Sequence, residues 1–185
     1  GVVKFILPYY ITYSNFVSST VAEADASLWG SGTNYSIGTL VMWKHRVYSA
    51  TAASTNKQPD LNPDVWFDKG PTNRWAVFDS KVSSATTFTN TATYVVTVSN
   101  VDTLAFYNMS ADSITATLRV AGSVVWTNTQ SCFDTSGINN VYNYLFFAVR
   151  RKKRIVMLGL PPHVNAELTI TLTATGSGSI GLIYL

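Results

Sequence analysis

The side chains in this sequence that are best suited to chemistry are three aromatic rings and three short polar groups between residues 43 and 66. They are Trp43, Tyr48, Trp66, Asn56, Gln58 and Asp60. An aromatic face can stack on the C–H face of a sugar ring, while amide and carboxylate groups pair with the sugar hydroxyls. These six side chains therefore predict a carbohydrate-binding site.

The same rings are also candidates for a hydrophobic core. A unit of about forty residues must use some of its aromatic rings as core, because it has few other large side chains. The core candidates are Tyr35, Val41, Val47 and Trp66. Trp43 precedes a Lys-His turn and is the ring that we expect to be exposed. Whether it would face a sugar or a protein partner stays open.

A second group of polar and aromatic residues lies in "PTNRWAVFDS", residues 71–80. Trp75 and Phe78 are three residues apart and can bury their rings where two packed units meet. Asn73 and Asp79 can satisfy backbone donors, and Arg74 can pair with a carboxylate or a carbonyl. This stretch predicts a structural junction, and the alternative is a ligand site formed by its arginine and aspartate.

The net charge of +3 comes from one basic run. Five of the 13 basic residues are Arg150, Arg151, Lys152, Lys153 and Arg154, so ten acidic residues outnumber the remaining eight. The run is either a patch for a phosphate group or a neighbouring subunit, or a solvated loop or edge strand. Nucleic-acid grooves usually draw basic residues from several elements, so no nucleic-acid partner is expected.

Catalytic patterns are weak in this chain. Asp60, Asp64 and Asp68 have helical spacing, but the prolines among them predict a loop. The two histidines, His45 and His163, are far apart and suggest neither a metal cluster nor a catalytic triad. We therefore expect a protein that is not an enzyme and needs no metal or cofactor.

The composition predicts an all-β fold. The chain is 46% hydrophobic and only 12% charged, and it is rich in Thr, Val, Ser and Tyr. A hairpin is predicted from strands at 39–43 and 46–51, joined by Lys44 and His45. Strand-length runs beyond Ser80 predict an antiparallel β-sandwich of jelly-roll type. They cover residues 93–100, 103–108, 113–130 with a turn at 121–123, 143–149, 154–160, 166–176 and 179–185.

The N-terminal region has a different pattern. Ser19 or Thr20 could cap a short helical turn ahead of Glu23. The opening "GVVKFILPYY" lacks the features of a signal peptide, and no apolar run reaches the about 20 residues of a membrane span. A lone Cys132 is expected to be a packed thiol. We divide the chain into an N-terminal assembly segment (1–28), an aromatic-rich unit with the junction (29–79) and the sandwich (80–185).

A spaced set of residues in the aromatic-rich unit resembles a known family. These residues are Trp29, Tyr35, Gly38, Val41, Val47, Tyr48, Asn56, Pro59 and Trp66. Their pattern is similar to that of small chitin- and cellulose-binding modules of secreted glycoside hydrolases. The resemblance implies carbohydrate binding and covers about a quarter of the chain.

A wider resemblance covers roughly residues 5–80. The order "ILPYYIT", "STVAEADASLW", the module-like unit and "PTNRWAVFDS" resembles virion proteins of tailed bacteriophages, from tail tips, baseplates or fibre attachments. It implies a structural or adaptor protein of the virion tail, made in the bacterial cytoplasm, whose partners are copies of itself and other tail proteins. A ring of three or six copies would fit tail symmetry.

Two alternative functions remain. One is an adhesin or receptor-binding protein that recognises glycan on the bacterial surface. The other is an accessory module of a secreted glycoside hydrolase, which the missing signal peptide and catalytic domain argue against. Adaptor and adhesin are compatible, and they differ in whether Trp43 faces solvent or a partner subunit.

Overall fold

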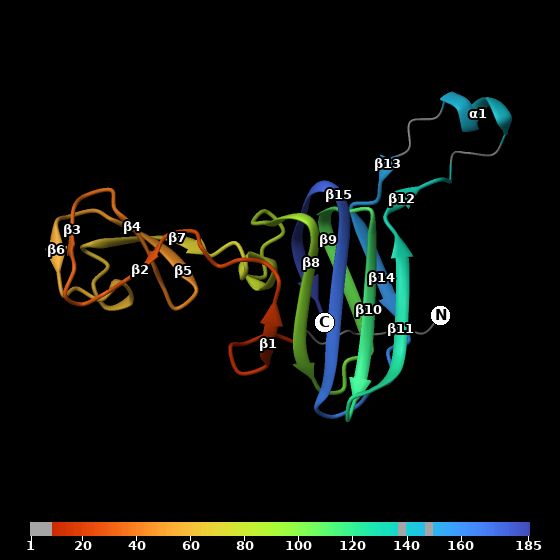
Figure 1. Cartoon of the computed structure of the whole chain (residues 1–185), viewed down its shortest axis with the longest axis horizontal. Helices are drawn as coiled ribbons and strands as arrows, with labels where there is room; N and C mark the ends of the chain where they lie inside the picture. The colour runs from red at the N-terminus through yellow and green to blue at the C-terminus, as the bar shows by residue number, and fades with distance from the viewer. Residues whose placement is uncertain (1–8, 137–139, 147–149) are drawn as a thin grey trace, which may run out of the picture.

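The computed structural model describes residues 9–136, 140–146 and 150–185 of the chain. Most of these residues lie in β-strands, so the all-β prediction is confirmed. Figure 1 shows a small β-unit beside a larger sandwich, along the long axis of the molecule. The rest of the regular structure in this described part is one helix, α1 (Val141–Phe146), and two 3-10 turns, η1 (Pro59–Leu61) and η2 (Ala76–Phe78).

The small unit, residues Ser27–Pro71, contains a four-stranded sheet and a two-stranded pair. The sheet has the order β2 (Ser27–Leu28), β4 (Leu40–Trp43), β5 (Arg46–Ala50) and β7 (Trp66–Pro71). The pair is formed by β3 (Asn34–Tyr35) and β6 (Ser54–Thr55). The predicted hairpin is confirmed as β4 and β5. Its turn residues, Lys44 and His45, have φ of 47° and 61°, as in the mirror-image turns that match strand twist.

The core of the small unit is built mainly from aromatic rings. Its buried members are Tyr35, Val41, Tyr48, Ala50, Val65 and Trp66, with Trp29 and Trp43 packed partly against them. Val47 was predicted as a core residue, but it is only half-buried. Side chains alternate along a strand, so β5 directs Tyr48 into the core and Val47 to the other face.

The large unit is a sandwich formed by folding one seven-stranded sheet. One layer has the order β1 (Phe16–Ser19), β8 (Thr86–Val98), β15 (Ala166–Tyr184), β10 (Ser113–Val120) and β11 (Ser123–Ser131). The other layer contains β9 (Thr103–Ser110) and β14 (Arg154–Leu158). The first half of β15 pairs with β10 and its second half with β9, so this strand joins the two layers.

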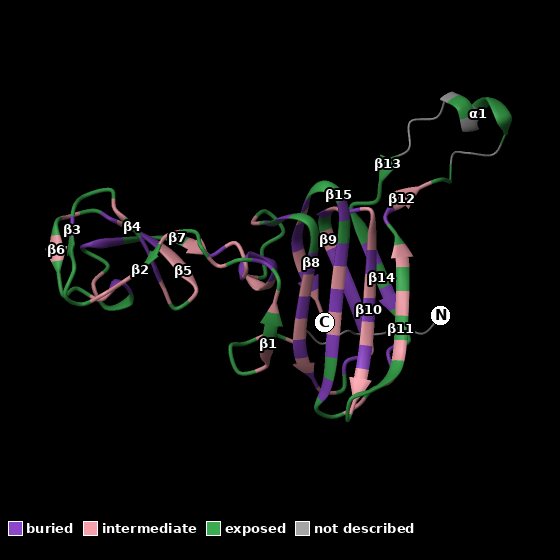
Figure 2. Cartoon of the chain, in the orientation of Figure 1, coloured by how far each residue is buried: buried purple, intermediate pink, exposed green. Residues whose placement is uncertain are grey.

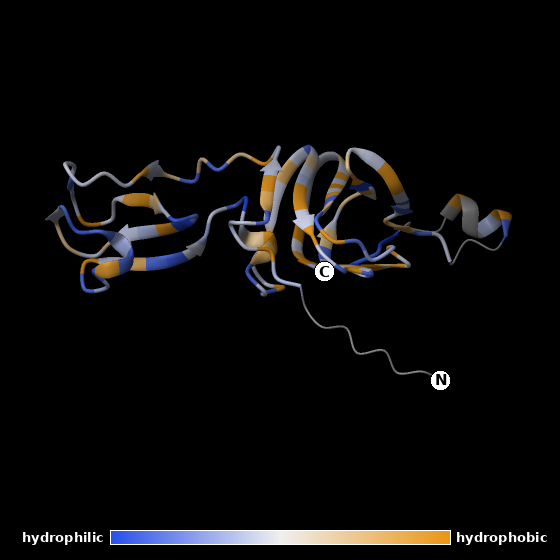
Figure 3. Cartoon of the chain, turned by 90° about the horizontal axis from the view of Figure 1, so that it is seen from below, coloured by the Kyte–Doolittle hydropathy of each residue, from blue (hydrophilic) through white to orange (hydrophobic). Residues whose placement is uncertain are grey.

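Alternating burial along the strands places the sandwich core between the two layers (Figure 2). Tyr94, Phe106, Leu168 and Ile170 are fully buried there, and hydrophobic segments occur in both layers when the molecule is turned by 90° (Figure 3). Cys132 is also fully buried, which confirms the packed thiol.

Three local predictions are wrong. Residues 19–25 form no helical turn, because Ser19 ends β1 and irregular chain follows. The run 143–149 was predicted as a strand, but its first part lies in α1, and residues 147–149 lie outside the described part. The separate strands predicted at 166–176 and 179–185 form the single strand β15.

The N-terminal segment and the basic run both contain strands that pair with other strands of the same chain. β1 pairs with β8, so residues 16–19 of the predicted assembly segment form an edge of the large sheet. Within the basic run, β13 (Arg150–Arg151) pairs with β12 (Phe133–Asp134), and β14 begins at Arg154. None of the helices within the described residues is long and apolar enough to cross a bilayer.

Candidate functional site

The side chain of Glu23 connects the two units. Its Oε1 accepts a hydrogen bond from the Thr72 hydroxyl at 2.7 Å and lies 2.8 Å from His45 Nδ1. Its Oε2 accepts one from Arg74 Nη1 at 3.3 Å. The Glu23 side chain is 15% exposed, so these contacts replace most of its hydration. The His45 turn of the small unit is thereby tied to the junction residues that lead into the sandwich.

The polar junction residues make further contacts within the chain. Arg74 Nε donates to the Val21 carbonyl at 2.7 Å. The Asn73 side chain donates to the Thr87 carbonyl and accepts from the Thr87 amide, both at 2.8 Å. Asp79 accepts from the Lys81 amide at 2.8 Å and from the Ser84 hydroxyl at 2.6 Å. These bonds give Asn73, Arg74 and Asp79 structural partners.

Trp75 lies at the centre of an aromatic cluster in the junction. It is 7% exposed, and its ring centroid lies 4.8 Å from those of Tyr13, Phe16 and His45. The ring of Phe78 is the next neighbour, and its centroid lies 6.0 Å from that of Trp75. The ring of Trp75 therefore contacts both the edge strand of the sandwich and the turn of the small unit.

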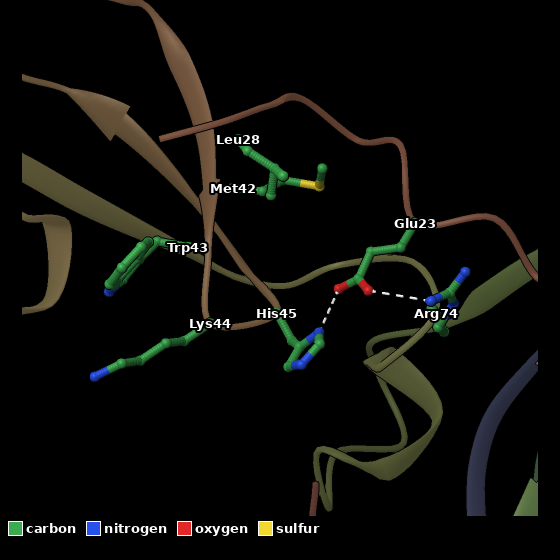
Figure 4. Close-up of a pocket in the computed structure, with 7 residues that line it drawn as sticks. All are labelled: Glu23, Leu28, Met42, Trp43, Lys44, His45 and Arg74. Carbon is green, nitrogen blue, oxygen red and sulfur yellow. Dashed lines mark hydrogen bonds and ion pairs between the residues drawn. The ribbon is translucent and has the colours of Figure 1, made fainter. Parts of the chain in front are cut away.

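A cavity of about 410 Å³ opens where the small unit meets the junction (Figure 4). We call it the Trp43 pocket, and it is lined by Glu23, Leu28, Met42, Trp43, Lys44, His45 and Arg74. Strands β2 and β4 supply its apolar side chains. The hairpin turn supplies Lys44 and His45, the chain between β1 and β2 supplies Glu23, and the junction supplies Arg74. Leu28 is 77% exposed, so part of the apolar wall is open to solvent.

A hydrogen-bonded group around Asp60 fixes the ring of Trp43. Asp60 Oδ1 accepts from Trp43 Nε1 at 2.9 Å and from Gln58 Nε2 at 2.7 Å, and Oδ2 pairs with Lys44 Nζ at 2.6 Å. The hydrogen bond from Lys44, followed by that from Gln58, lowers the pKa of Asp60 to about 2. The ring of Trp29 packs edge-on against Trp43, with centroids 5.2 Å apart.

The structure brings together only half of the predicted carbohydrate-contacting side chains. Trp43, Gln58 and Asp60 form one group on the surface, as described above. Tyr48 and Trp66 are 6% and 3% exposed, so their ring faces are not available for stacking, which corrects their assignment to the site. They are buried because a unit of this size must use some of its aromatic rings as core. Asn56 lies in the turn after β6, with φ of 55°.

The sequence patterns did not indicate Glu23 as a site residue, and they connected His45 only with the hairpin turn. Glu23 is 22 positions from His45 and 49 from Thr72, so no local spacing signals their contact. The acidic residue was assigned to a helix start, whereas its carboxylate joins three side chains across the junction. Only the folding of the small unit back onto the chain creates this arrangement.

Members of the basic run are exposed, and several have partners within the chain. Arg151 Nη2 pairs with Asp112 Oδ1 at 2.6 Å, and its guanidinium lies 5.7 Å from the centre of the Phe133 ring. The Lys152 amide donates to the Cys132 carbonyl at 2.7 Å. Binding of phosphate by this run stays a prediction. No group of three metal-ligating side chains occurs within the described residues.

Comparison with known proteins gives no family assignment. No protein-family model matches the chain. No curated protein matches it either. Among solved structures, the chain is similar to the lectin domain of lectinolysin complexed with Lewis b antigen, at 15% identity and a TM-score of 0.38, over 59% of this chain and 79% of that one.

Two further solved structures give similar sequence identities, TM-scores and coverages. A histidine mutant of the lectinolysin lectin domain, also with Lewis b, has 14% identity and a TM-score of 0.39, over 60% and 80% of the two chains. A mutant of chitosan-binding module 1, from a chitosanase/glucanase of Paenibacillus sp. IK-5, has 10% identity and a TM-score of 0.37, over 60% and 80%. TM-scores this low do not place the chain in either family. The class that its own fold and site define is an all-β protein of two units, with an aromatic-walled pocket where the small unit meets the junction.

Proposed function

We propose that this protein binds glycans through the Trp43 pocket. The observation that carries the proposal is the ring of Trp43, partly exposed and held by Asp60 at the wall of a cavity of about 410 Å³. A sugar ring can stack its C–H face on such a ring, and its hydroxyls can pair with the nearby carboxylate and cationic groups.

The ring is held in place before any ligand arrives. Trp29 packs edge-on against Trp43, and Asp60 accepts the hydrogen bond of its indole N–H. Asp60 is in turn held by Lys44 and Gln58. Side chains that are already ordered lose little entropy when a ligand binds, and this favours affinity.

The test is titration calorimetry of the purified protein with bacterial surface polysaccharide and with chito- and cello-oligosaccharides. We expect saturable binding by the wild type, weakened by about tenfold or more in Trp43→Ala, a loss of roughly 1.4 kcal/mol. Phe67→Ala is the matched control, because this ring is 62% exposed in the small unit and does not line the pocket. Folded wild type that binds none of these glycans, or equal affinities in all three proteins, would contradict the proposal.

A second candidate function is that of a virion tail component that packs against copies of itself and against other tail proteins. The resemblance of residues 5–80 to tail proteins suggests it, and one feature of the sandwich supports it. Strand β11 is an edge strand of nine residues without a charged residue or a proline, and its outer side has no strand partner among the described residues. Long edges of this kind are ready to pair with another chain. Glycan binding and tail assembly are compatible functions.

A further inference from the structure

We propose that the Trp43 pocket is one half of a longer groove, and that a second aromatic cavity on the other side of His45 binds additional sugar units of the same chain. This inference rests on the proposed glycan binding and extends it to a second subsite. The second cavity has a volume of about 430 Å³. We call it the Tyr13 cavity, and its lining includes Tyr13, His45, Arg46, Trp75, Phe78 and Asp79.

Tyr13 provides the exposed ring of this cavity. It is 58% exposed, although its ring lies 4.6 Å from that of His45 and 4.8 Å from that of Trp75, between centroids. Its hydroxyl donates to the Lys44 carbonyl at 3.1 Å. These three contacts hold the ring in one orientation while much of it remains open, which is the property required of a stacking platform for a sugar.

Polar groups accompany the rings, as hydroxyl-bearing ligands require. Arg46 and Asp79 line the same cavity and can exchange hydrogen bonds with sugar hydroxyls. Trp75 also lines it, and its buried Nε1 has no hydrogen-bond partner among the described residues.

His45 connects the two cavities. Its side chain lines both of them and is 38% exposed. Glu23 holds it on the side of the Trp43 pocket, and the rings of Tyr13 and Trp75 contact it on the other side. An oligosaccharide that stacks on Trp43 can therefore extend across His45 to stack on Tyr13.

The charges around the groove favour a neutral ligand. Each nearby cation already pairs with a carboxylate: Lys44 with Asp60, Arg46 with Asp68 and Arg74 with Glu23, at 2.6, 2.7 and 3.3 Å. A polyanion would have to compete with these carboxylates, whereas a neutral glycan would not. The ligand class is therefore a neutral oligosaccharide longer than the Trp43 pocket alone can hold.

The test is the dependence of affinity on ligand length. Calorimetry with chito- and cello-oligosaccharides from disaccharide to hexasaccharide compares the full-length wild type with Tyr13→Ala and Tyr13→Phe. We expect wild-type affinity to rise with length, by about tenfold over the series. Tyr13→Ala should lose this gain and keep the disaccharide affinity, whereas Tyr13→Phe should retain the gain because it keeps the ring. Tyr10→Ala is the control, since this ring is 62% exposed and lies outside the Tyr13 cavity.

The outcomes separate this inference from the proposed function. A length gain that is unchanged in Tyr13→Ala, or affinity that does not depend on length, would overturn the second subsite and leave the Trp43 pocket standing. Absence of binding at every length by folded wild type would overturn both. Thermal melting of each variant shows that the comparison is made between folded proteins.

Discussion

At the scale of single residues, Asp60 determines how the ring of Trp43 and the cation of Lys44 are placed in the candidate site. It accepts from both Trp43 and Gln58 and pairs with Lys44, so one exposed carboxylate orients the ring and holds the nearest cation. The same hydrogen bonds lower its pKa to about 2, from an ordinary value of 3.8. The group therefore stays ionised over the whole physiological range.

This pKa predicts how binding depends on pH. Since the pKa of Asp60 is lower in the folded protein, its ion pair is complete above about pH 4 and is lost as the pH falls through about 2. The contribution of Asp60 to glycan affinity should therefore be unchanged down to about pH 4 and should decline as the pH falls further. Asp60→Asn keeps an acceptor for the ring but has no charge to lose, so its affinity should lack this decline.

The measurement is tryptophan fluorescence titration with glycan at a series of acidic pH values. Circular dichroism at each value confirms that the protein is still folded. The same decline in wild type and in Asp60→Asn would show that another group controls binding.

At the scale of elements, the junction between the small unit and the sandwich depends on Trp75. Its ring contacts Phe16 of β1, His45 of the hairpin turn and Phe78 of η2. Glu23 adds polar contacts to Thr72, His45 and Arg74 at the same place. Because both candidate cavities include residues of this junction, the geometry of the site depends on its packing.

Trp75→Ala should destabilise the protein strongly. Removing a buried tryptophan ring leaves a cavity, and we expect the free energy of unfolding to fall by about 3–5 kcal/mol. Chemical denaturation monitored by circular dichroism measures the change. Phe67→Ala is the control for loss of an exposed ring and should change the stability by less than about 1 kcal/mol. Equal midpoints for wild type and Trp75→Ala would show that the junction is not held by this ring.

At the scale of the whole molecule, the sandwich has one long open edge. Strand β11 pairs with β10 on one side, and cross-strand hydroxyl pairs, Thr115 with Thr129 and Thr117 with Thr127, line the exposed face. The opposite edge of the same layer is β1, which has four residues and an irregular register. The open edge at β11 is therefore the better candidate for contact with a second copy.

Pairing of β11 with its own copy would be two-fold symmetric and antiparallel. Thr127 lies at the middle of the strand, so a pairing centred there would place this residue opposite itself. Thr127→Lys would then place two positive charges face to face, and like charges directly opposite each other destabilise a strand pair. We expect sedimentation velocity to detect dimers of the wild type and only monomers of the variant.

The control for this experiment is Thr173→Lys, which adds the same charge at an exposed position of the interior strand β15. It should dimerise like the wild type. Wild-type protein that remains monomeric at high concentration would exclude self-pairing through β11.

Much of the fold could be predicted from the sequence, because strands and turns are encoded locally. Alternation of apolar and polar residues marks strands such as β8 and β10, and the Lys44-His45 pair was correctly placed as a hairpin turn. The merging of two predicted strands into β15 was missed, since the chain crosses Gly176, with φ of 84°, without leaving the sheet. Local signals do not show whether a glycine ends a strand or only bends it.

The candidate site shows more clearly which features the sequence predicts and which depend on the folded chain. Residue types and their period were enough to predict that an aromatic-rich unit with a Trp-bearing hairpin precedes a β-sandwich. The folded chain, and not the pattern, settles which rings are buried, since alternation defines two faces of β5 but not which one is covered. It placed Tyr48 and Trp66 in the core, left Trp43 at the pocket wall, and joined Glu23 to His45 and Arg74 through contacts between residues distant in the chain.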